Sequence, residues 1–212
     1  MRPRFKSLIF LVALTSRPLM AEIIVDISPL ALNSGSSGYV DILIHSDTGT
    51  DPLQFYSMDL EITPLAGANS TLAFSATQDE PHLTDTNYIF AGDSFGGGFW
   101  SRPTPTTLTS ASDFTFSGSD VAVPDSPFAL LYQVLVEHTA GPLGSGPGHQ
   151  FDISVTAFDF EDENFNLITP TFNSGTVTIN SAAVPEPGTL SACLVGGLLW
   201  ILRRRRSHMT QV

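Results

Sequence analysis

The sequence predicts an all-β protein organised as a two-sheet antiparallel β-sandwich. Three observations support this prediction. Apolar and polar residues alternate with a period of two in several short segments, and turn-forming Gly, Pro, Asn and Asp residues separate these segments. Between residues 22 and 180, no stretch of ten or more residues follows the period of an amphipathic helix. Roughly eight to ten strands are expected in about 160 residues.

The expected strands follow one another along the chain. Those with alternating or strand-forming character span residues 23–27, 38–45, 55–63, 151–158 and 175–179. In the third of these, Met58, Leu60 and Ile62 form an apolar face, whereas Asp59 and Glu61 point to water. This alternation predicts strands that are buried on one face only.

Residues 128–136 form a nearly continuous apolar run. Such a run is expected of a central strand covered on both faces, although periodicity alone does not separate it from a buried helix. Tyr132, Val134 and Val136 favour the strand, because aromatic and β-branched residues suit a pleated sheet. Turn signals lie between the strands, at residues 33–35, 47–49, 96–98 and 141–148.

Charge is distributed in three blocks. Residues 1–21 and 187–212 are basic, whereas residues 22–186 hold all 21 acidic residues and one base, Arg102. Such a region cannot neutralise a phosphate backbone, so nucleic acid binding is excluded. The single cysteine, Cys193, excludes a disulfide framework within the chain. Four histidines of the domain have no short metal-ligand spacing, so zinc is not expected; these are His45, His82, His138 and His149.

The N-terminal residues 1–21 have the layout of a secretory signal peptide. Arg2, Arg4 and Lys6 precede an apolar run, and the small residue Ala21 marks the expected cleavage site. A buried N-terminal helix is the alternative, but a basic cluster has no reason to precede a core helix. The sequence therefore predicts export of the domain at residues 22–180.

The C-terminal region has three consecutive parts after a short linker at residues 181–184. The first is the motif Pro185-Glu186-Pro187, and the second is an uncharged stretch that ends at Leu202. As a helix, this short hydrophobic stretch would span about 24 Å, less than the roughly 30 Å hydrocarbon core of a bilayer. The third part is a basic cluster expected to stop in the cytoplasm, before a tail at residues 207–212. This cluster consists of Arg203, Arg204, Arg205 and Arg206.

This order of features, over residues 185–206, resembles the PEP-CTERM sorting signal of Gram-negative bacteria. The resemblance implies that an exosortase-type transpeptidase recognises Pro185, Glu186 and Pro187 and removes the tail. The protein would then be anchored only transiently in the inner membrane before it reaches the cell surface or the exopolysaccharide matrix. A stop-transfer helix without sorting function is the alternative, and the coincidence of all three parts disfavours it.

The domain as a whole also resembles, more loosely, cohesin-like and carbohydrate-binding-module-like sandwiches. The resemblance lies in the order of the strands at residues 23–27, 38–45, 55–63, 151–158 and 175–179. It implies a jelly-roll or cohesin-like sandwich that serves as a binding or scaffolding module. It carries over no functional residue, because the strands match and a site does not.

Ser94 lies in the sequence Gly92-Asp93-Ser94-Phe95-Gly96, which fits the G-x-S-x-G pattern of serine hydrolases. The nucleophile elbow of these enzymes requires a helix after the serine. Here three glycines follow, and then Pro103 and Pro105, which no helix would tolerate. A glycine-rich surface loop is therefore expected, and no enzymatic activity.

An acidic segment near the end of the domain contains candidate calcium ligands. Oxygen-bearing side chains at alternate positions can converge on one calcium ion. The candidates are Asp159, Asp162, Asn164 and Asn166. The segment departs from an EF-hand, because Leu167 stands where that loop requires glycine. A solvated acidic hairpin loop is the alternative, and calcium is the only cofactor considered.

Aromatic residues beside the triple glycine form a candidate glycan platform, because sugar rings stack on exposed aromatic rings. Phe99, Trp100 and Arg102 are its expected members, with Phe95 and Asp93 close by in the sequence. Burial of the aromatic rings in the core is the alternative.

The sequence thus predicts an exported, non-enzymatic domain at the surface or in the exopolysaccharide matrix of a Gram-negative bacterium. A structural or adhesive role is expected, with exopolysaccharide and the exosortase-type transpeptidase as partners. The alternative is a cohesin-like module that binds a defined glycan or protein ligand.

Overall fold

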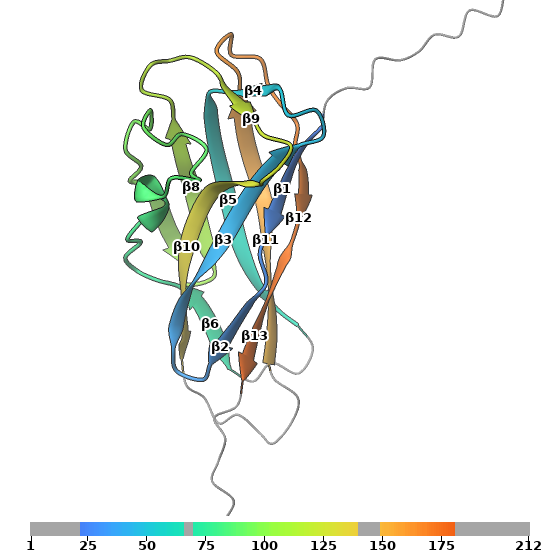
Figure 1. Cartoon of the computed structure of the whole chain (residues 1–212). Helices are drawn as coiled ribbons and strands as arrows, with labels where there is room; N and C mark the ends of the chain where they lie inside the picture. The colour runs from blue at the N-terminus through green and yellow to red at the C-terminus, as the bar shows by residue number, and fades with distance from the viewer. Residues whose placement is uncertain (1–21, 66–69, 140–148, 181–212) are drawn as a thin grey trace, which may run out of the picture.

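A computed structural model of the chain describes residues 22–65, 70–139 and 149–180. These residues form an elongated β-sandwich with one short 3-10 helix (Figure 1). The strands are β1 (Ile23–Ile27), β2 (Leu30–Asn33), β3 (Ser37–Ser46), β4 (Asp51–Leu53), β5 (Phe55–Pro64), β6 (Thr71–Phe74), β7 (Phe99–Thr104), β8 (Thr107–Phe114), β9 (Val121–Val123), β10 (Ala129–Thr139), β11 (His149–Glu161), β12 (Thr171–Asn173) and β13 (Gly175–Asn180).

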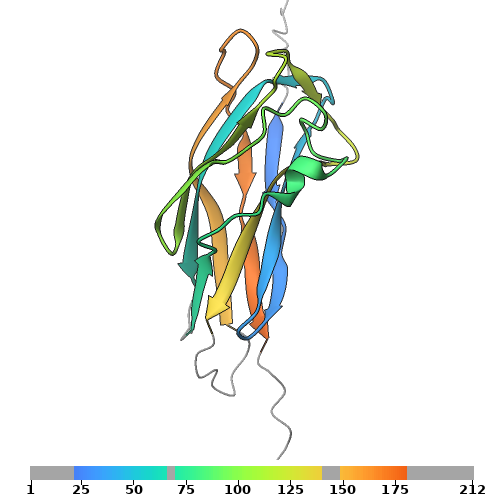
Figure 2. The same ribbon diagram turned by 90° about the vertical axis from the view of Figure 1, so that its left-hand side faces the viewer.

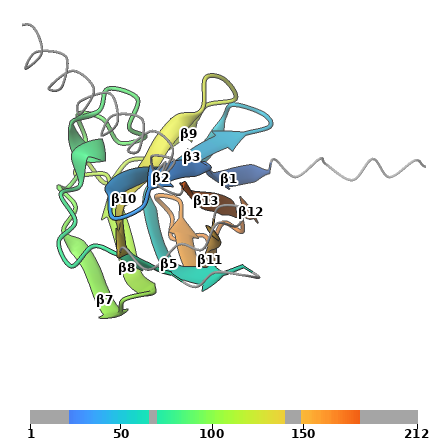
Figure 3. The ribbon, with the colours of Figure 1, turned by 90° about the horizontal axis from the view of Figure 1, so that it is seen from below.

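The strands form two large sheets and a small third one. One large sheet has the order β12-β1-β3-β10-β6, and the other has the order β2-β13-β11-β5-β8-β7. Seen from below, the two sheets lie as facing layers (Figure 3). The short strands β4 and β9 pair with each other at the upper end of the molecule. The predicted all-β sandwich is confirmed, and thirteen strands occur within the described residues, more than the eight to ten expected.

The sheets are not purely antiparallel, because the chain changes sheet near both ends of the domain. β1 lies in the first sheet and β2, directly after it, in the second. In the same way β12 pairs with β1, and β13 crosses to the other sheet and pairs with β2. Both of these pairs are parallel, whereas the remaining pairs are antiparallel.

The burial of the strands follows the alternation in the sequence. Along β5, Met58, Leu60 and Ile62 face the core and are buried, while Glu61 is exposed. Between the sheets, side chains from both layers form one hydrophobic core. The largest side chains in it with almost no exposed surface include Tyr56, Tyr132, Phe74, Phe90, Phe151 and Phe160.

β10 confirms that the apolar run near residue 130 is a strand. Residues Ala129 to Tyr132 are all buried, because the segment of residues 75–98 covers the outer face of this strand. This segment contains the 3-10 helix η1 (Pro81–Thr84) and passes in front of the sandwich in Figure 2. It is fixed to β10 by three backbone hydrogen bonds, from Ser75 N to Leu135 O (2.8 Å), from Ile89 N to Leu130 O (2.8 Å) and from Leu130 N to Asn87 O (2.9 Å).

The predicted signal peptide, linker and sorting signal lie outside the described residues. β13 ends at the lower end of the sandwich in Figure 1, just before the linker would begin. Within residues 22–65, 70–139 and 149–180, no helix has the length and hydrophobicity needed to cross a bilayer.

Candidate binding site

Four phenylalanines form a cluster on the outside of the six-stranded sheet, at the free edge made by β7 and β8. We call this cluster the aromatic patch, and its members are Phe95, Phe99, Phe114 and Phe116. The rings of Phe95 and Phe114 stack, with centroids 4.4 Å apart and planes inclined by 19°. Phe99 and Phe116 lie 6.1 and 6.4 Å from the ring of Phe95. Phe95, Phe99 and Phe116 are 49%, 46% and 74% exposed, so much of their apolar surface faces water.

Two chain segments bring these rings together. β7 begins with Phe99 and pairs with β8, which ends at Phe114. The glycine-rich loop before β7 contributes Phe95, whose backbone N–H donates to the carbonyl of Phe114 at 2.9 Å. Phe116 follows β8, and its N–H donates to the carbonyl of Asp93 at 2.5 Å. The patch is therefore held by backbone hydrogen bonds between residues 93–95 and residues 114–116.

The triple glycine lets the loop return to the sheet. Gly97 has a φ of +56°, and a Cβ at this position would lie 2.9 Å from Leu83 Cδ1 and 3.0 Å from Glu80 Oε1. A side chain here would meet both strain and contact with η1. Gly98 N–H donates to Glu80 Oε1 at 2.9 Å. Partial burial raises the pKa of the Glu80 carboxyl.

A buried polar network lies under the patch and is centred on Asp113. The Asp113 carboxylate has no exposed surface and accepts hydrogen bonds from three donors: Tyr88 Oη (2.7 Å), Ser94 Oγ and Phe114 N (2.8 Å). Tyr88 Oη also lies 3.1 Å from Tyr56 Oη, which donates to the carbonyl of Leu131 in β10 at 2.8 Å. Burial raises the pKa of both tyrosines well above the ordinary value, so both remain hydrogen-bond donors.

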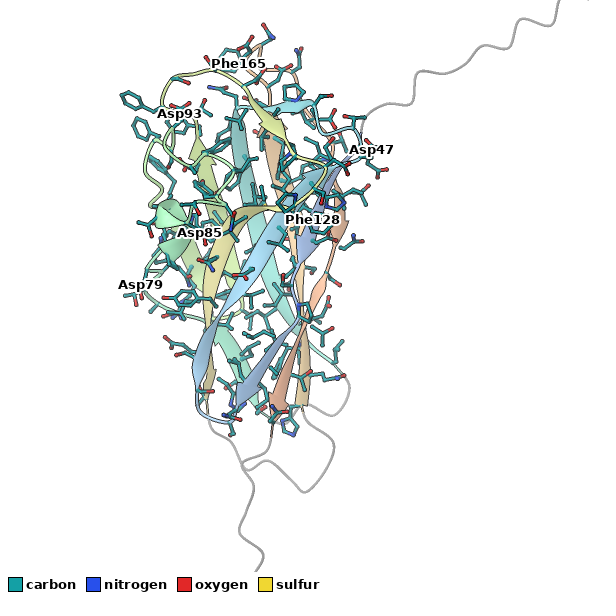
Figure 4. The ribbon with its side chains drawn as sticks, in the orientation of Figure 1. Asp47, Asp79, Asp85, Asp93, Phe128 and Phe165 are labelled. Atoms are coloured by element: carbon teal, nitrogen blue, oxygen red, sulfur yellow. The ribbon has the colours of Figure 1, made fainter. Side chains whose placement is uncertain are left out.

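Asp93 fastens the outer part of the loop. Its Oδ1 accepts from Ser117 N at 2.9 Å, and its Oδ2 accepts from Ser117 Oγ at 2.6 Å. Figure 4 places Asp93 near the upper end of the molecule, on the same side as Asp79 and Asp85. Of these three acidic residues, Asp93 is the one in contact with the aromatic patch, through its backbone bond to Phe116.

The predicted glycan platform is only partly reproduced in space. Phe99 is exposed, whereas Trp100 points to the opposite side of β7 and packs against the core. Arg102 Nη1 donates to the carbonyl of Phe74 at 2.5 Å, so it holds β7 to the end of β6. Two phenylalanines at and just after the end of β8 complete the cluster instead of Trp100: Phe114 lies next to Phe99, and Phe116 lies next to Phe95. The signal that could have identified them is their period-two spacing at the end of the strand over residues 107–114.

Ser94 has the surroundings of a structural residue. Its hydroxyl donates to the buried carboxylate of Asp113 and accepts from Gly96 N at 3.0 Å. No histidine is among its hydrogen-bond partners in the described part of the chain. A bridge to Thr115 and the glycines that follow replace the helix of a nucleophile elbow.

Three candidate calcium ligands, Asp162, Asn164 and Asn166, lie in the turn after β11, whereas Asp159 lies within β11, opposite Ser57 of β5. Asp162 Oδ1 accepts from the backbone N–H groups of Asn164 (2.8 Å) and Asn166 (2.9 Å), and Asp162 Oδ2 accepts from Asn166 Nδ2 (2.8 Å). These bonds lower the pKa of Asp162 and close the turn without a metal. Across the three described ranges, no group of three or more His, Cys, Asp or Glu side chains is placed to hold a metal ion. Calcium binding at this turn remains a prediction.

A groove of about 360 Å³ lies at the lower end of the sandwich, with walls that include Ile62, Pro64 and Phe151. Ser70 on its rim contacts His149 Nδ1 through its hydroxyl at 2.7 Å. In sequence, the lining residues Ser70 and Thr139 of the groove adjoin residues 66–69 and 140–148, which the structure does not describe. The aromatic patch is therefore the better-defined candidate site.

Comparison with known proteins gives the fold. The structure is similar to the sixth cohesin of scaffoldin B from Acetivibrio cellulolyticus, solved in complex with a Cel5 dockerin mutant. The TM-score is 0.52 at 15% sequence identity, over 75% of this chain and 99% of that cohesin. The fold is that of a cohesin domain.

Other cohesins give similar matches. The non-cellulosomal cohesin of the archaeon Archaeoglobus fulgidus matches with a TM-score of 0.48 and 10% identity, over 81% of this chain and 97% of that one. By sequence, no protein-family model and no curated protein matches the chain. The match to the scaffoldin B cohesin confirms, for the fold, the cohesin-like resemblance inferred from the order of the strands.

Proposed function

We propose that the chain is a non-enzymatic protein-binding module, exported and carried at the cell surface, that docks a partner protein through the aromatic patch. The observation that carries this proposal is the exposure of Phe95, Phe99 and Phe116, which backbone hydrogen bonds and the pairing of β7 with β8 hold together. Exposed, clustered apolar side chains mark interaction sites on soluble domains. Aromatic residues are also enriched in the centres of protein interfaces.

The polar groups around the patch favour a protein over a glycan. Sugar recognition requires side chains that hydrogen-bond the hydroxyl groups in addition to a ring for stacking. Asp93 is engaged by Ser117, and Arg102 by the carbonyl of Phe74. The rings of Phe95 and Phe114 stack on each other, so each covers one face of the other. The surface offers apolar area with few free polar groups, which suits an apolar protein anchor.

Charge indicates the second property of the partner. Every acidic residue except Glu186 lies between residues 22 and 180, where Arg102 is the only base. Asp79, Asp85 and Asp93 lie along one side of the molecule in Figure 4, and the carbonyl of Asp93 accepts from the N–H of Phe116 in the patch. A partner with basic residues around its apolar anchor would be attracted to this surface, and its association should weaken with salt.

Two features support a non-enzymatic role. Ser94, the one serine in a hydrolase-like pattern, is used to bind Asp113. The cohesin fold of the domain is similar to that of a protein solved with a dockerin, although the fold alone does not give a function. For this chain we propose a partner protein of basic, apolar character rather than a dockerin in particular.

Photo-crosslinking tests the docking site. We expect a photoreactive benzoylphenylalanine in place of Phe116 to crosslink the native protein to one defined partner protein at the cell surface. Phe165 is the matched control position, because it is 75% exposed against 74% for Phe116 and lies in the turn after β11. A crosslink from Phe165 to the same partner, or a product containing polysaccharide instead of protein, would contradict the proposal.

A second set of variants shows whether the patch carries the binding energy. In the Phe116 probe background, Phe99→Ser is expected to lower the crosslinking yield by about tenfold or more, because buried aromatic anchors dominate interface energies. Phe128→Ser is the control, since Phe128 is 47% exposed against 46% for Phe99 and stacks on His45, outside the patch. Equal losses for the two variants would overturn the assignment of the site.

The proposed sorting to the cell surface is tested separately, by mass analysis of the terminal peptides. We propose that the native protein found at the surface or in the medium ends near residues 184–187, with the tail removed. Alanine at Pro185, Glu186 and Pro187 should leave the full tail on protein in the inner membrane. If unaltered protein also keeps its tail there, the domain is an ordinary anchored one and sorting is ruled out.

A further inference from the structure

Burial of the Asp113 carboxylate costs desolvation free energy, and no positive charge nearby in the described part of the chain offsets this cost. The carboxylate has no exposed surface, and within the described residues no Lys, Arg or His lies within ion-pair distance of it. An isolated carboxylate without a cation is among the most costly groups to place in a protein interior. An apolar side chain at this position would serve the core better.

Hydrogen bonds replace the missing cation, and two of the three donors belong to the site. Ser94 directly precedes Phe95, and Phe114 is itself a member of the patch. The third donor, Tyr88, comes from the segment that covers β10. Asp113 therefore joins the glycine-rich loop, the end of β8 and the covering segment at one point.

The bonds fix the stacked pair of rings at the centre of the patch. Ser94 and Phe114 are held on the same carboxylate, and the rings of Phe95 and Phe114 stack 4.4 Å apart just outside it. The loop itself contains three consecutive glycines with positive φ and has little conformational restraint of its own. Without the bond to Ser94, the loop would keep its backbone bonds to residues 114–116 but lose the side-chain contact next to Phe95 that ties it to Asp113.

We propose that Asp113 is the positioning residue of the aromatic patch, and that its buried carboxylate fixes Phe95 against Phe114 through Ser94. This proposal rests on the proposed docking function. In it, the polar network around Asp113 serves to fix the shape of the binding site rather than to stabilise the sandwich. Docking would then lose less conformational entropy, because the anchor is already ordered before the partner arrives.

Amide hydrogen exchange of the full chain tests this role without a partner. In Ser94→Ala, we expect the amides of Phe95 and Gly98 to exchange about tenfold faster or more, because the loop opens locally. Both amides donate to acceptors that the substitution leaves in place, Phe114 O and Glu80 Oε1. Unchanged protection of these two amides would overturn the positioning role.

Tyr56→Phe is the matched control. It removes the hydroxyl at the far end of the same network, where Tyr56 contacts Tyr88 and Leu131 but no residue of the patch. We expect Tyr56→Phe to lower the melting temperature of the domain. The exchange protection of the Phe95 and Gly98 amides should fall no more than that of the amides in the core strands. If both variants loosen the loop equally, the network is only structural and the proposal is wrong.

A triple variant separates the effect of the network on the position of the aromatic rings from its effect on the stability of the domain. Tyr88→Phe, Ser94→Ala and Asp113→Leu together replace the network by apolar groups, and the melting temperature is expected to stay equal or to rise. The crosslinking yield from Phe116 should nevertheless fall. If the Phe116 probe gives no crosslink in the otherwise unaltered protein, the docking function is disproved. The hydrogen-exchange experiment would still decide the role of Asp113.

Discussion

A Gly175→Ala substitution is expected to destabilise the domain by about 3 kcal/mol, near the upper end for overpacked cores. Gly175 begins β13 at the point where the chain crosses from one sheet to the other, next to the end of β1. A Cβ at this position would lie 2.6 Å from both the carbonyl oxygen and the Cγ2 of Ile27. The carbonyl belongs to the backbone of a strand in the opposite sheet, so it cannot turn away as a side chain would.

Two other glycines provide the controls. Gly118→Ala should cost about 1 kcal/mol, because Gly118 has a φ of +71° but no heavy atom within 4 Å of the added Cβ. At Gly38, the nearest atom is the flexible end of Leu32 at 2.7 Å, which can move. Urea denaturation of the three variants measures the difference. A cost at Gly175 no greater than that at Gly118 would show that the crossing of the two chain segments tolerates a side chain.

This crossing is a part of the fold that sequence reasoning did not reach. The strands predicted from alternation carry enough residues to show it, as Met58, Leu60 and Ile62 do in β5. Two longer strands, β7 and β8, were missed because they carry few apolar residues and their pairing has register shifts. The other missed strands, β2, β4, β6, β9 and β12, are only three or four residues long. Such segments contain at most two residues per face, so a period of two leaves no readable pattern. Their membership in one sheet or the other depends on partners that are distant in the sequence.

The candidate site was predicted only in part, because it too depends on residues that are distant in the sequence. Phe99 was identified from its place beside the triple glycine. Trp100 was placed on the same platform because residues 99–104 were not predicted to be a strand, and in a strand neighbouring side chains point to opposite faces. Asp113 was missed. Its donors Tyr88 and Ser94 lie 25 and 19 residues away, and no local pattern connects them. A buried carboxylate surrounded by hydroxyl groups is a property of packing, which appears only when the covering segment is folded onto the sandwich.

A second large effect is expected on lowering the pH, and it arises from His82. The imidazole of His82 has no exposed surface and lies between the rings of Tyr132 (4.4 Å) and Tyr88 (5.1 Å). Its Nδ1 accepts from Gln133 N at 3.4 Å, so the ring is neutral with its proton on Nε2. Burial lowers the pKa of His82 from 6.5 to about 4, against a smaller opposing effect of the Asp113 charge.

The sign of the pH effect follows from this shift. Between pH 6.5 and 4 the unfolded chain binds a proton at His82 and the folded chain does not, so the free energy of unfolding falls as the pH is lowered. The loss should reach about 2 kcal/mol at pH 5 and about 3 kcal/mol at pH 4. Glu80 acts in the opposite direction, because its pKa is raised by burial and its protonation favours the folded state at low pH.

His82→Gln isolates the contribution of the histidine. Glutamine is uncharged throughout this range, and its amide oxygen can accept from the Gln133 N–H group. The variant should be less stable than the native protein at pH 7, and the gap should narrow by about 3 kcal/mol between pH 7 and pH 4. Urea denaturation at intervals across this range measures the gap. A gap that stays constant with pH would mean that His82 takes up its proton equally in the folded and unfolded chain, so that burial between the two tyrosine rings does not lower its pKa.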